Sequence, residues 1–135
     1  MPYWLLKSEP SVYSWDHLVK DGRTHWNGVR NHQAAANLKA MKPGDQAFFY
    51  HSNEGKEIVG IVEIVKEAYP DPTDETGKFV KVDVKALKPL KTPVTLAAMK
   101  ATPALKDMAL LRQSRLSVCP VGAAEWKGII KISEK

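Results

Sequence analysis

The sequence predicts an α+β domain in which five to six short strands curl into an antiparallel barrel or half-barrel, with short helices at the periphery. Three observations support this. The chain has 135 residues, 44% of them hydrophobic, which is enough for one core but hardly for two. Strand-like and helix-like patterns follow one another along the chain, and closing a small sheet protects its edges. The single cysteine, Cys119, excludes an intrachain disulfide, so packing alone holds the fold. We therefore expect one domain spanning residues 1–135.

The N-terminal region predicts a strand followed by a helix. The apolar run "YWLLK" (3–7) is typical of a short strand, and Pro10 ends it because the residue before a proline avoids the helical region. A helix is expected between a capping Ser14 and a closing Gly22. Its buried face should carry Trp15, Leu18 and Val19.

The next segments predict a second helix and a hairpin. "QAAANLKAM" (33–41) has helical spacing of its apolar residues. "QAFFYHS" (46–52) and "EIVGIVEIVK" (57–66) predict strands joined by a turn at 53–55, and the second is so apolar that it should be central in the sheet. Gly60 within it indicates a bulge or a close backbone approach.

The C-terminal half predicts a strand, two short helices, a further strand and a last helix. These are expected at 79–87, 95–101, 104–111, 115–120 and 122–133. The strand at 79–87 alternates with a period of two, which is typical of an antiparallel strand with one buried face. Its core face should carry Val80, Val82, Val84 and Ala86, and its water face Lys81, Asp83 and Lys85.

Charge is unevenly distributed along the chain. The formal net charge is +5. Residues 54–75 hold seven acids against two lysines, whereas residues 78–115 hold nine cations against two acids. The sequence therefore predicts a positive side that would suit an anionic partner, although solvated lysines that serve solubility would give the same composition.

Several classes of protein are disfavoured. There is no run of about 18 apolar residues and no signal peptide at the N-terminus, which predicts a cytoplasmic or nuclear protein without a membrane partner. No spacing of cysteine and histidine resembles a metal site, no cofactor is expected, and no nucleophile, base and orienting group form a recognisable chain. The oligomeric state is not determined by the sequence.

The heptapeptide "HWNGVRN" (25–31) has too few aliphatic residues for a core element and is typical of a pocket wall. Trp26 could stack on a planar ligand or could be a plain core aromatic. Asn27 could read a ligand edge, and Gly28 could make a turn or admit a ligand to the backbone. Arg30 is expected to contact a ligand or phosphate, and Asn31 to cap the following helix.

Polar residues also gather where two predicted strands end. After the first strand, "KSEP" places Lys7, Ser8 and Glu9 at the rim, although the lysine could be snorkelling and Glu9 could pair with a neighbouring cation. After the strand at 46–52, the candidate residues are Tyr50, His51 and Ser52. A single histidine without a partner is more often structural than catalytic.

Three further candidates lie later in the chain. "EAYPDPT" (67–73) is expected to be a rigid loop whose Tyr69 could close the pocket. Arg115 and Ser117 should share one face of their strand, where Arg115 could bind phosphate or simply be a surface residue.

Long motifs give the chain a family resemblance. They include "YWLLKSEP" (3–10), "WNGVRNHQA" (26–34), "GDQAFFYHSN" (44–53) and "IVGIVEIVKEAYPDPT" (58–73). With "YSWDHL" and "RLSVCP", they resemble the EVE domain family, a branch of the PUA-like superfamily. The resemblance implies a PUA-like β-barrel with flanking helices. It also implies similarity to the YTH domain, which reads methylated adenine in RNA.

The YTH relative holds its modified base with a Lys-Ser pair after the first strand and a tryptophan downstream. The matching positions here are Lys7, Ser8 and Trp26. Family members are associated with modified cytosines in DNA, while the sequence itself does not choose between DNA and RNA.

The resulting hypothesis is a non-catalytic reader of a modified base in nucleic acid, with the base flipped into an aromatic pocket. Trp26 and either Tyr50 or Tyr69 would hold the base, and Arg30 and Arg115 would meet phosphates. One alternative is a hydrolase of modified nucleosides, by analogy with the related ASCH group, in which Lys7 and Glu9 would act. Another is a module that binds a small molecule or a protein.

Overall fold

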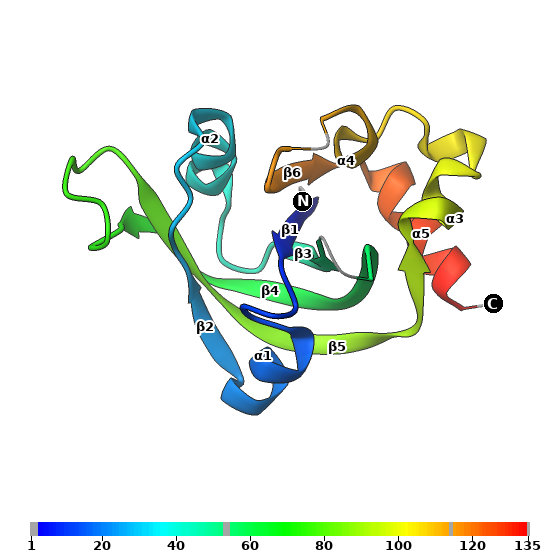
Figure 1. Ribbon diagram of the computed structural model, residues 1–135, viewed down its shortest axis with the longest axis horizontal. Coiled ribbons are helices and arrows are strands. Elements are labelled where there is room, and N and C mark those ends of the chain that lie inside the picture. The colour runs from blue at the N-terminus through cyan, green and yellow to red at the C-terminus, as the bar shows by residue number, and fades with distance from the viewer. Residues whose placement is uncertain (1–2, 53–54, 114, 135) are drawn as a thin grey trace.

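The structure, a computed structural model, describes residues 3–52, 55–113 and 115–134. Within these ranges the chain forms a mixed six-stranded sheet with helices packed around it (Figure 1). The strands are β1 (Tyr3–Ser8), β2 (Arg23–Trp26), β3 (Gln46–His51), β4 (Glu57–Pro70), β5 (Val80–Thr95) and β6 (Val118–Val121). The helices are α1 (Trp15–Asp21), α2 (His32–Ala40), α3 (Leu96–Lys100), α4 (Ala109–Arg112) and α5 (Ala123–Ser133), with a 3-10 turn, η1, at Pro103–Leu105.

The α+β class is confirmed, and of the expected barrel or half-barrel the closed antiparallel barrel is wrong. The strand order is β2-β5-β4-β3-β1-β6, so β2 and β6 are edges of an open sheet. β1 and β3 run parallel, and the remaining pairs are antiparallel. The parallel pair is possible because the connection between β1 and β3 carries α1, β2 and α2, which is long enough for a crossover.

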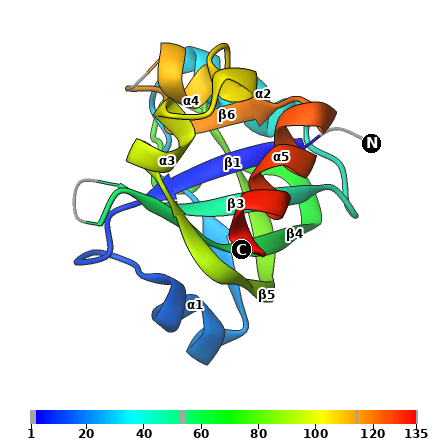
Figure 2. The ribbon, with the colours of Figure 1, turned by 90° about the vertical axis from the view of Figure 1, so that its right-hand side faces the viewer.

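The helices cover the sheet in separate groups. α5 packs against β5, and α2 packs against β4, β5 and β6. Figures 1 and 2 show α1 at the opposite end of the molecule from α3 and α4. No helix in the described ranges is both long enough and apolar enough to cross a bilayer.

Two aromatic clusters fill the core on either side of β3. Phe48 stacks on Trp126 of α5 with ring centroids 3.8 Å apart. Phe49, the next residue, points the other way and meets the edges of Trp15 and Trp26, each at 5.6 Å. The alternation of a strand therefore assigns adjacent phenylalanines to two clusters, and the second of these reaches the candidate site.

Local sequence signals were reliable at the first helix and in the central strand. Ser14 caps α1 and Gly22 closes it with φ of +78°. β4 is central in the sheet, as predicted. A Cβ added at Gly60 would lie 2.5 Å from the ring of Trp15, and the β4–β5 register shifts between Ile58 and Gly60. Both readings of this glycine, close approach and bulge, are confirmed.

The predicted strand at 79–87 is longer and more buried than expected. β5 continues through Pro89 and Pro93 to Thr95, because the bulged pairing with β4 tolerates residues that lack a donor. Lys81 and Asp83 are 8% and 4% exposed, so their expected water-facing positions are wrong. Polar partners from β2 and β4 explain how this face can be covered.

Four other expectations need correction. Residues 23–26 form β2, which was not predicted, and Val19 is 54% exposed on the outer face of α1. The helix expected at 104–111 is broken into η1 and α4, with Pro103 opening the first turn. The last strand begins at Val118 rather than at 115. The predicted turn at 53–55 falls partly on residues 53–54, which lie outside the described residues.

Candidate nucleic-acid interface

A pocket of about 280 Å³ lies where β1 and β2 end. It brings together seven of the residues predicted from the sequence: Lys7, Ser8, Trp26, Asn27, Gly28, Arg30 and Ser117. His25 and Val29 also line it and belong to the heptapeptide expected to form a pocket wall, whereas Tyr13 was not predicted. We call this the first pocket. It is somewhat smaller than the roughly 300–1,000 Å³ typical of drug-sized ligands, which suits a single planar base.

Strand pairing brings the rim residues together. The parallel β1–β3 register sets Lys7 beside Tyr50 and Ser8 beside His51. On the other side of β1, the backbone N–H of Lys7 donates to the carbonyl of Ser117 at 3.0 Å. Residues from three distant parts of the chain therefore meet around Lys7, a proximity that follows from a crossover connection the sequence did not reveal.

Trp26 is both a core residue and a pocket wall. Its side chain is 7% exposed and its ring meets the edge of Phe49, while its remaining surface lines the first pocket. The pairing of Trp26 with Val82 in β5 fixes its backbone. The two interpretations of Trp26 considered from the sequence are therefore not exclusive.

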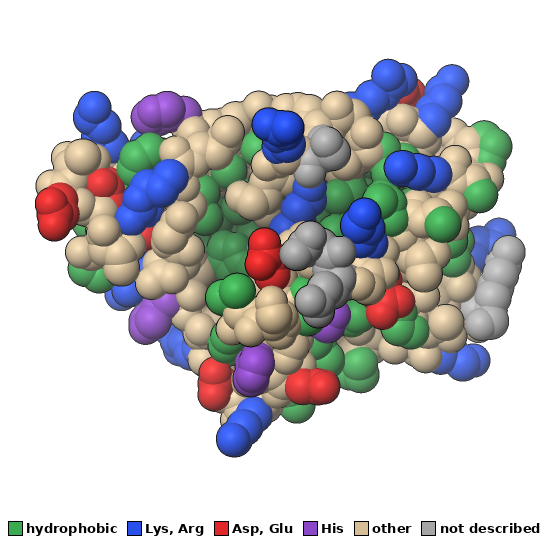
Figure 3. Space-filling model, in the orientation of Figure 1, with side chains coloured by type: hydrophobic (Ala, Val, Ile, Leu, Met, Phe, Trp, Pro, Cys, Tyr) green, Lys and Arg blue, Asp and Glu red, His purple; other side chains and the backbone are tan. Residues whose placement is uncertain are grey.

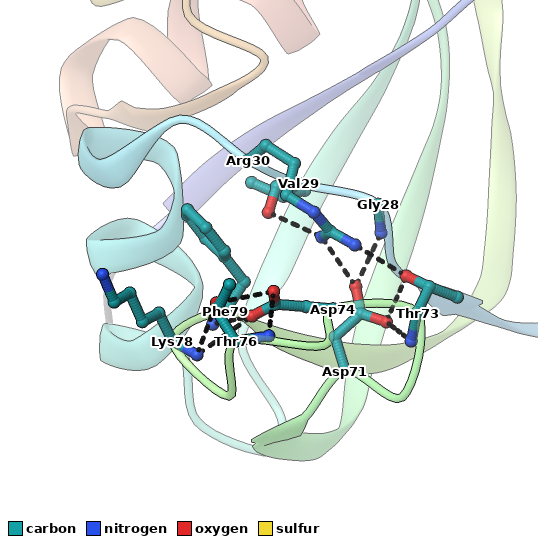
Figure 4. A network of polar contacts seen from close by, with 9 residues as sticks. All are labelled: Gly28, Val29, Arg30, Asp71, Thr73, Asp74, Thr76, Lys78 and Phe79. Carbon is teal, nitrogen blue, oxygen red and sulfur yellow. Dashed lines mark hydrogen bonds and ion pairs between the residues drawn. The ribbon is translucent and has the colours of Figure 1, made fainter.

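The segment after Trp26 is held in place by Asp71, whose role was not predicted (Figure 4). The Asp71 carboxylate accepts from the N–H of Gly28 at 2.8 Å and from Nη1 of Arg30 at 3.1 Å. Nη2 of Arg30 donates to the hydroxyl of Thr73 at 2.9 Å, and its guanidinium lies over the ring of Phe79 at 5.4 Å. Several donors of Arg30 are thus already engaged, and its position favours a role in fixing the pocket wall.

Burial and hydrogen bonding act in opposite directions on Asp71. Burial raises the pKa of this carboxyl, but hydrogen bonds from Thr73, Gly28 and Arg30 outweigh it and hold the pKa well below its usual range. The carboxylate therefore stays charged at neutral pH. Gly28 has φ of +76°, a conformation that suits glycine. The Asp-Pro-Thr turn was visible in the sequence, but the hydrogen bonds that Gly28 and Arg30 donate to Asp71 were not.

Tyr69 lies in β4 rather than in a loop, and it is not among the residues that line the first pocket. Its hydroxyl donates to Oδ1 of Asp83 at 2.6 Å and lies 3.0 Å from Nδ1 of His25. Arg23 also donates to Asp83, at 3.1 Å. These contacts join β2 to the buried face of β5, and they place Tyr69 behind the pocket wall.

The same cluster shifts the pKa values of its members. Burial and the bond to Asp83 raise the pKa of Tyr69 to about 12. Burial would raise the pKa of Asp83, but hydrogen bonds from Tyr69, His25 and Arg23 lower it to about 2. Asp83 is therefore an anion that stabilises the attachment of β2 at the sheet edge.

His51 and Glu9 make structural contacts. Neither residue lines the first pocket or the pocket beside it that contains Tyr50. Nε2 of His51 accepts from the N–H of Trp15 at 3.0 Å, at the start of α1. Burial lowers the pKa of His51, which favours the neutral ring that can accept this bond. The Glu9 side chain is exposed, and its carbonyl accepts from the N–H groups of Val12 and Tyr13.

Arg115 and Ser117 precede β6, so the expected strand does not place them on one face. Ser117 lines the first pocket. Arg115 lies instead in a hollow of about 310 Å³ that it shares with Arg112, Gln33 and Asn31. Asn31 caps α2 by accepting from the N–H of Ala34 at 2.9 Å, as predicted.

A second pocket of about 240 Å³ adjoins the first and shares Lys7 with it. Tyr50 and Ser52 line this second pocket, together with residues of α3 and α4 that the sequence did not identify. Figure 3 shows a hollow near the middle of the drawn face, with hydrophobic side chains at its floor and both basic and acidic side chains around it. No group of three or more potential metal ligands occurs in the described part of the chain.

These features define a class: an α+β module with an open mixed sheet and a polar pocket where its strands end, walled by one tryptophan and rimmed by cations. The EVE domain family matches residues 2–132, and the chain belongs to this family.

Relatives share this fold over nearly the whole chain. Human thymocyte nuclear protein 1 is 36% identical over an alignment that covers 98% of this chain and 74% of that protein. A Rhodopseudomonas palustris protein solved by NMR is 65% identical, with a TM-score of 0.94 and coverage of 99% and 94% of the two chains. A further relative is known from the crystal structure of human THYN1 protein in complex with 5-methylcytosine containing DNA. Its sequence is 35% identical to this chain, with a TM-score of 0.90 and coverage of 100% of this chain and 99% of that chain.

Proposed function

We propose that this protein is a non-catalytic module that binds DNA carrying a modified cytosine and holds the modified base, flipped out of the stack, in the first pocket. The observation that carries the proposal is the pocket itself. Its lining combines the largely buried Trp26 with amide, hydroxyl and ammonium groups. The DNA-bound structure of the human relative supports DNA as the nucleic acid and 5-methylcytosine as the first modification to test.

The residues divide into those that would contact the base and those that would hold the wall. Trp26 supplies the stacking face, which contributes about 1–3 kcal/mol per base. Asn27, Ser8 and Lys7 lie around it and would read the base edge. Asp71 and Arg30 would fix the wall between them. Extruding a base costs a few kcal/mol, which stacking and edge hydrogen bonds can offset.

Phosphate contacts would come from cations outside the first pocket. Arg115 and Arg112 line the hollow that also includes Asn31, and lysines line the second pocket. Such contacts position the DNA and supply most of the salt-dependent affinity.

The test is an incubation with short duplexes that each carry one modified cytosine, and with the corresponding free nucleosides, followed by mass spectrometry. We expect duplexes with one modification to be retained over unmodified duplexes, and we expect every nucleoside to be recovered intact. Turnover of any modified nucleoside would overturn the non-catalytic assignment. Retention without preference for any modification would overturn base reading.

A further inference from the structure

The second pocket has a lining that differs chemically from that of the first. It opens between the end of β3 and helices α3 and α4, and it shares only Lys7 with the first pocket. Its polar lining consists of Lys7, Tyr50, Ser52, Lys56 and Lys100. Its charged lining among the residues that the structure describes is three lysines.

Tyr50 supplies a hydroxyl that has no hydrogen-bond partner among the described residues. The residue is 4% exposed, yet its hydroxyl makes no hydrogen bond within the described ranges. No side-chain polar atom of the described residues is both buried and unpartnered, so this hydroxyl must be reachable from the pocket. Burial raises the pKa of Tyr50, which keeps the hydroxyl protonated and able to donate.

Lys56 is held at the pocket in a costly backbone conformation. Its φ is +47°, and it is the only non-glycine residue with positive φ in the described part of the chain. The N–H of Leu96 donates to its carbonyl at 2.8 Å, which ties this conformation to the start of α3. Residues other than glycine rarely adopt a positive φ, and those held in this conformation tend to cluster at binding sites.

The polar groups of the second pocket are suited to one kind of ligand. The ammonium groups of Lys56 and Lys100 can only donate and carry positive charge, so they match the oxygens of an anion, to which the Tyr50 hydroxyl can donate a further hydrogen bond. The remaining lining is apolar, from Leu96, Leu110 and Leu111. A phosphate with an attached sugar presents this combination of charged oxygens and carbon surface.

We propose that the second pocket is a subsite for the phosphodiester and sugar adjoining the flipped nucleotide. This inference rests on the proposed function. Tyr50 Oη and the ammonium groups of Lys56 and Lys100 hold the phosphate oxygens, and the leucines contact the sugar. The shared wall at Lys7 makes the two pockets neighbours, so a base in the first carries its adjoining phosphate toward the second.

The experiment combines variants of the protein with single neutral linkages in the DNA. Duplexes with one 5-methylcytosine carry a methylphosphonate at one of the linkages flanking that nucleotide. Wild type is compared with Tyr50→Phe, Lys56→Gln and Lys100→Gln. The matched control is Lys88→Gln, since Lys88 lines a separate hollow next to α5. Melting temperatures verify that each variant is folded.

We expect Tyr50→Phe to weaken binding about tenfold, the usual effect of losing a hydrogen bond to a charged group. Lys56→Gln and Lys100→Gln should each lower the salt slope by about one, and Lys88→Gln should change it less. A neutral linkage at the contacted position should weaken binding by wild type. It should weaken binding by the three variants much less, because each variant already lacks a side-chain group that contacts this phosphate.

The outcomes separate this subsite from the proposed function. If wild type prefers the modified duplex but a neutral linkage weakens wild type and variants equally, the subsite is wrong and the proposed function stands. If wild type binds no duplex, the proposed function fails and the subsite with it. If inorganic phosphate alone shifts the NMR signals of Tyr50 while the DNA arms show no coupling, the pocket binds a free anion and the phosphodiester assignment is overturned.

Discussion

At the scale of single residues, the sequence identified most of the first pocket but not how its members act. Lys7 and Ser8 were found because they follow an apolar strand with polar side chains, and Trp26 because it stands in a heptapeptide with few aliphatic residues; the family resemblance pointed to the same three positions. Asp71 was missed because its function depends on Gly28 and Arg30, which are about forty positions away in sequence. Tyr69 was misplaced because β4 continues four residues past the predicted strand, up to Pro70.

Trp26 should affect stability and binding together. Because it is 7% exposed and packs on Phe49, Trp26→Ala should lower the free energy of unfolding by about 3–5 kcal/mol. Trp26→Phe should destabilise the fold less than Trp26→Ala. It should still reduce the free energy of binding to modified DNA, by at most about 1–3 kcal/mol. The control is Trp126→Phe in the other aromatic cluster, which should lose stability and keep its affinity. Equal affinities of wild type, Trp26→Phe and Trp126→Phe for modified DNA would contradict the assignment of Trp26 to the pocket wall.

Lys7 and Arg115 should differ in what they recognise. Lys7 lines the first pocket, whereas Arg115 lies in the neighbouring hollow. Lys7→Ala should therefore reduce the preference for the modified base, and Arg115→Ala should weaken modified and unmodified duplexes alike and lower the salt slope by about one. Titrations at two salt concentrations measure both effects. Indistinguishable variants would contradict this division of roles.

At the scale of elements, capped helices and apolar central strands were predictable because their signals are local. Ser14, Gly22 and the run in β4 needed no distant partner. β2 was not predictable: "RTHW" has no alternation of apolar residues, and it becomes a strand only because β5 offers an edge. The parallel pairing of β1 with β3 likewise depends on the crossover between them.

The loop that follows β4 should control the order of the pocket wall. Asp71 is buried and accepts hydrogen bonds from Gly28, Arg30 and Thr73, so Asp71→Ala should leave these donors without their acceptor. Because the Arg30 side chain is 41% exposed and can be solvated, the loss should be that of hydrogen bonds to a charged group, about 1.5–3 kcal/mol. Hydrogen exchange should show faster exchange at residues 27–30 than in wild type. Asp74→Ala is the control, since Asp74 bonds only within its own loop, and it should leave exchange at 27–30 unchanged.

Acid should loosen the attachment of β2 to β5. The pKa of Asp83 is lowered from 3.8 to about 2 in the folded protein. A lowered pKa stabilises the fold above the unfolded value, and this contribution is lost as pH falls from about 4 toward 2. It amounts to about 2 kcal/mol. Unfolding free energies measured across this range should fall less steeply for Asp83→Asn than for wild type, and identical slopes would show that Asp83 does not make this contribution.

At the scale of the whole molecule, the α+β class was predictable from the sequence, while the open sheet followed from a topology that no local pattern encodes. The net charge of +5 and the cations that line the second pocket and the hollow at Arg115 should make DNA affinity fall steeply with salt. A logarithmic plot of affinity against salt for an unmodified duplex measures this. A flat response would contradict the phosphate contacts on which the interface depends.

The central claim is that the first pocket reads a modified cytosine. Its most direct test is a competition titration of the wild-type protein with two duplexes that differ only in one 5-methyl group, at physiological salt. We expect the methylated duplex to bind more tightly, and we expect Lys7→Ala to lose that preference while it retains most of its affinity for the unmethylated duplex. Equal affinity of the wild-type protein for the two duplexes would contradict the claim for this modification.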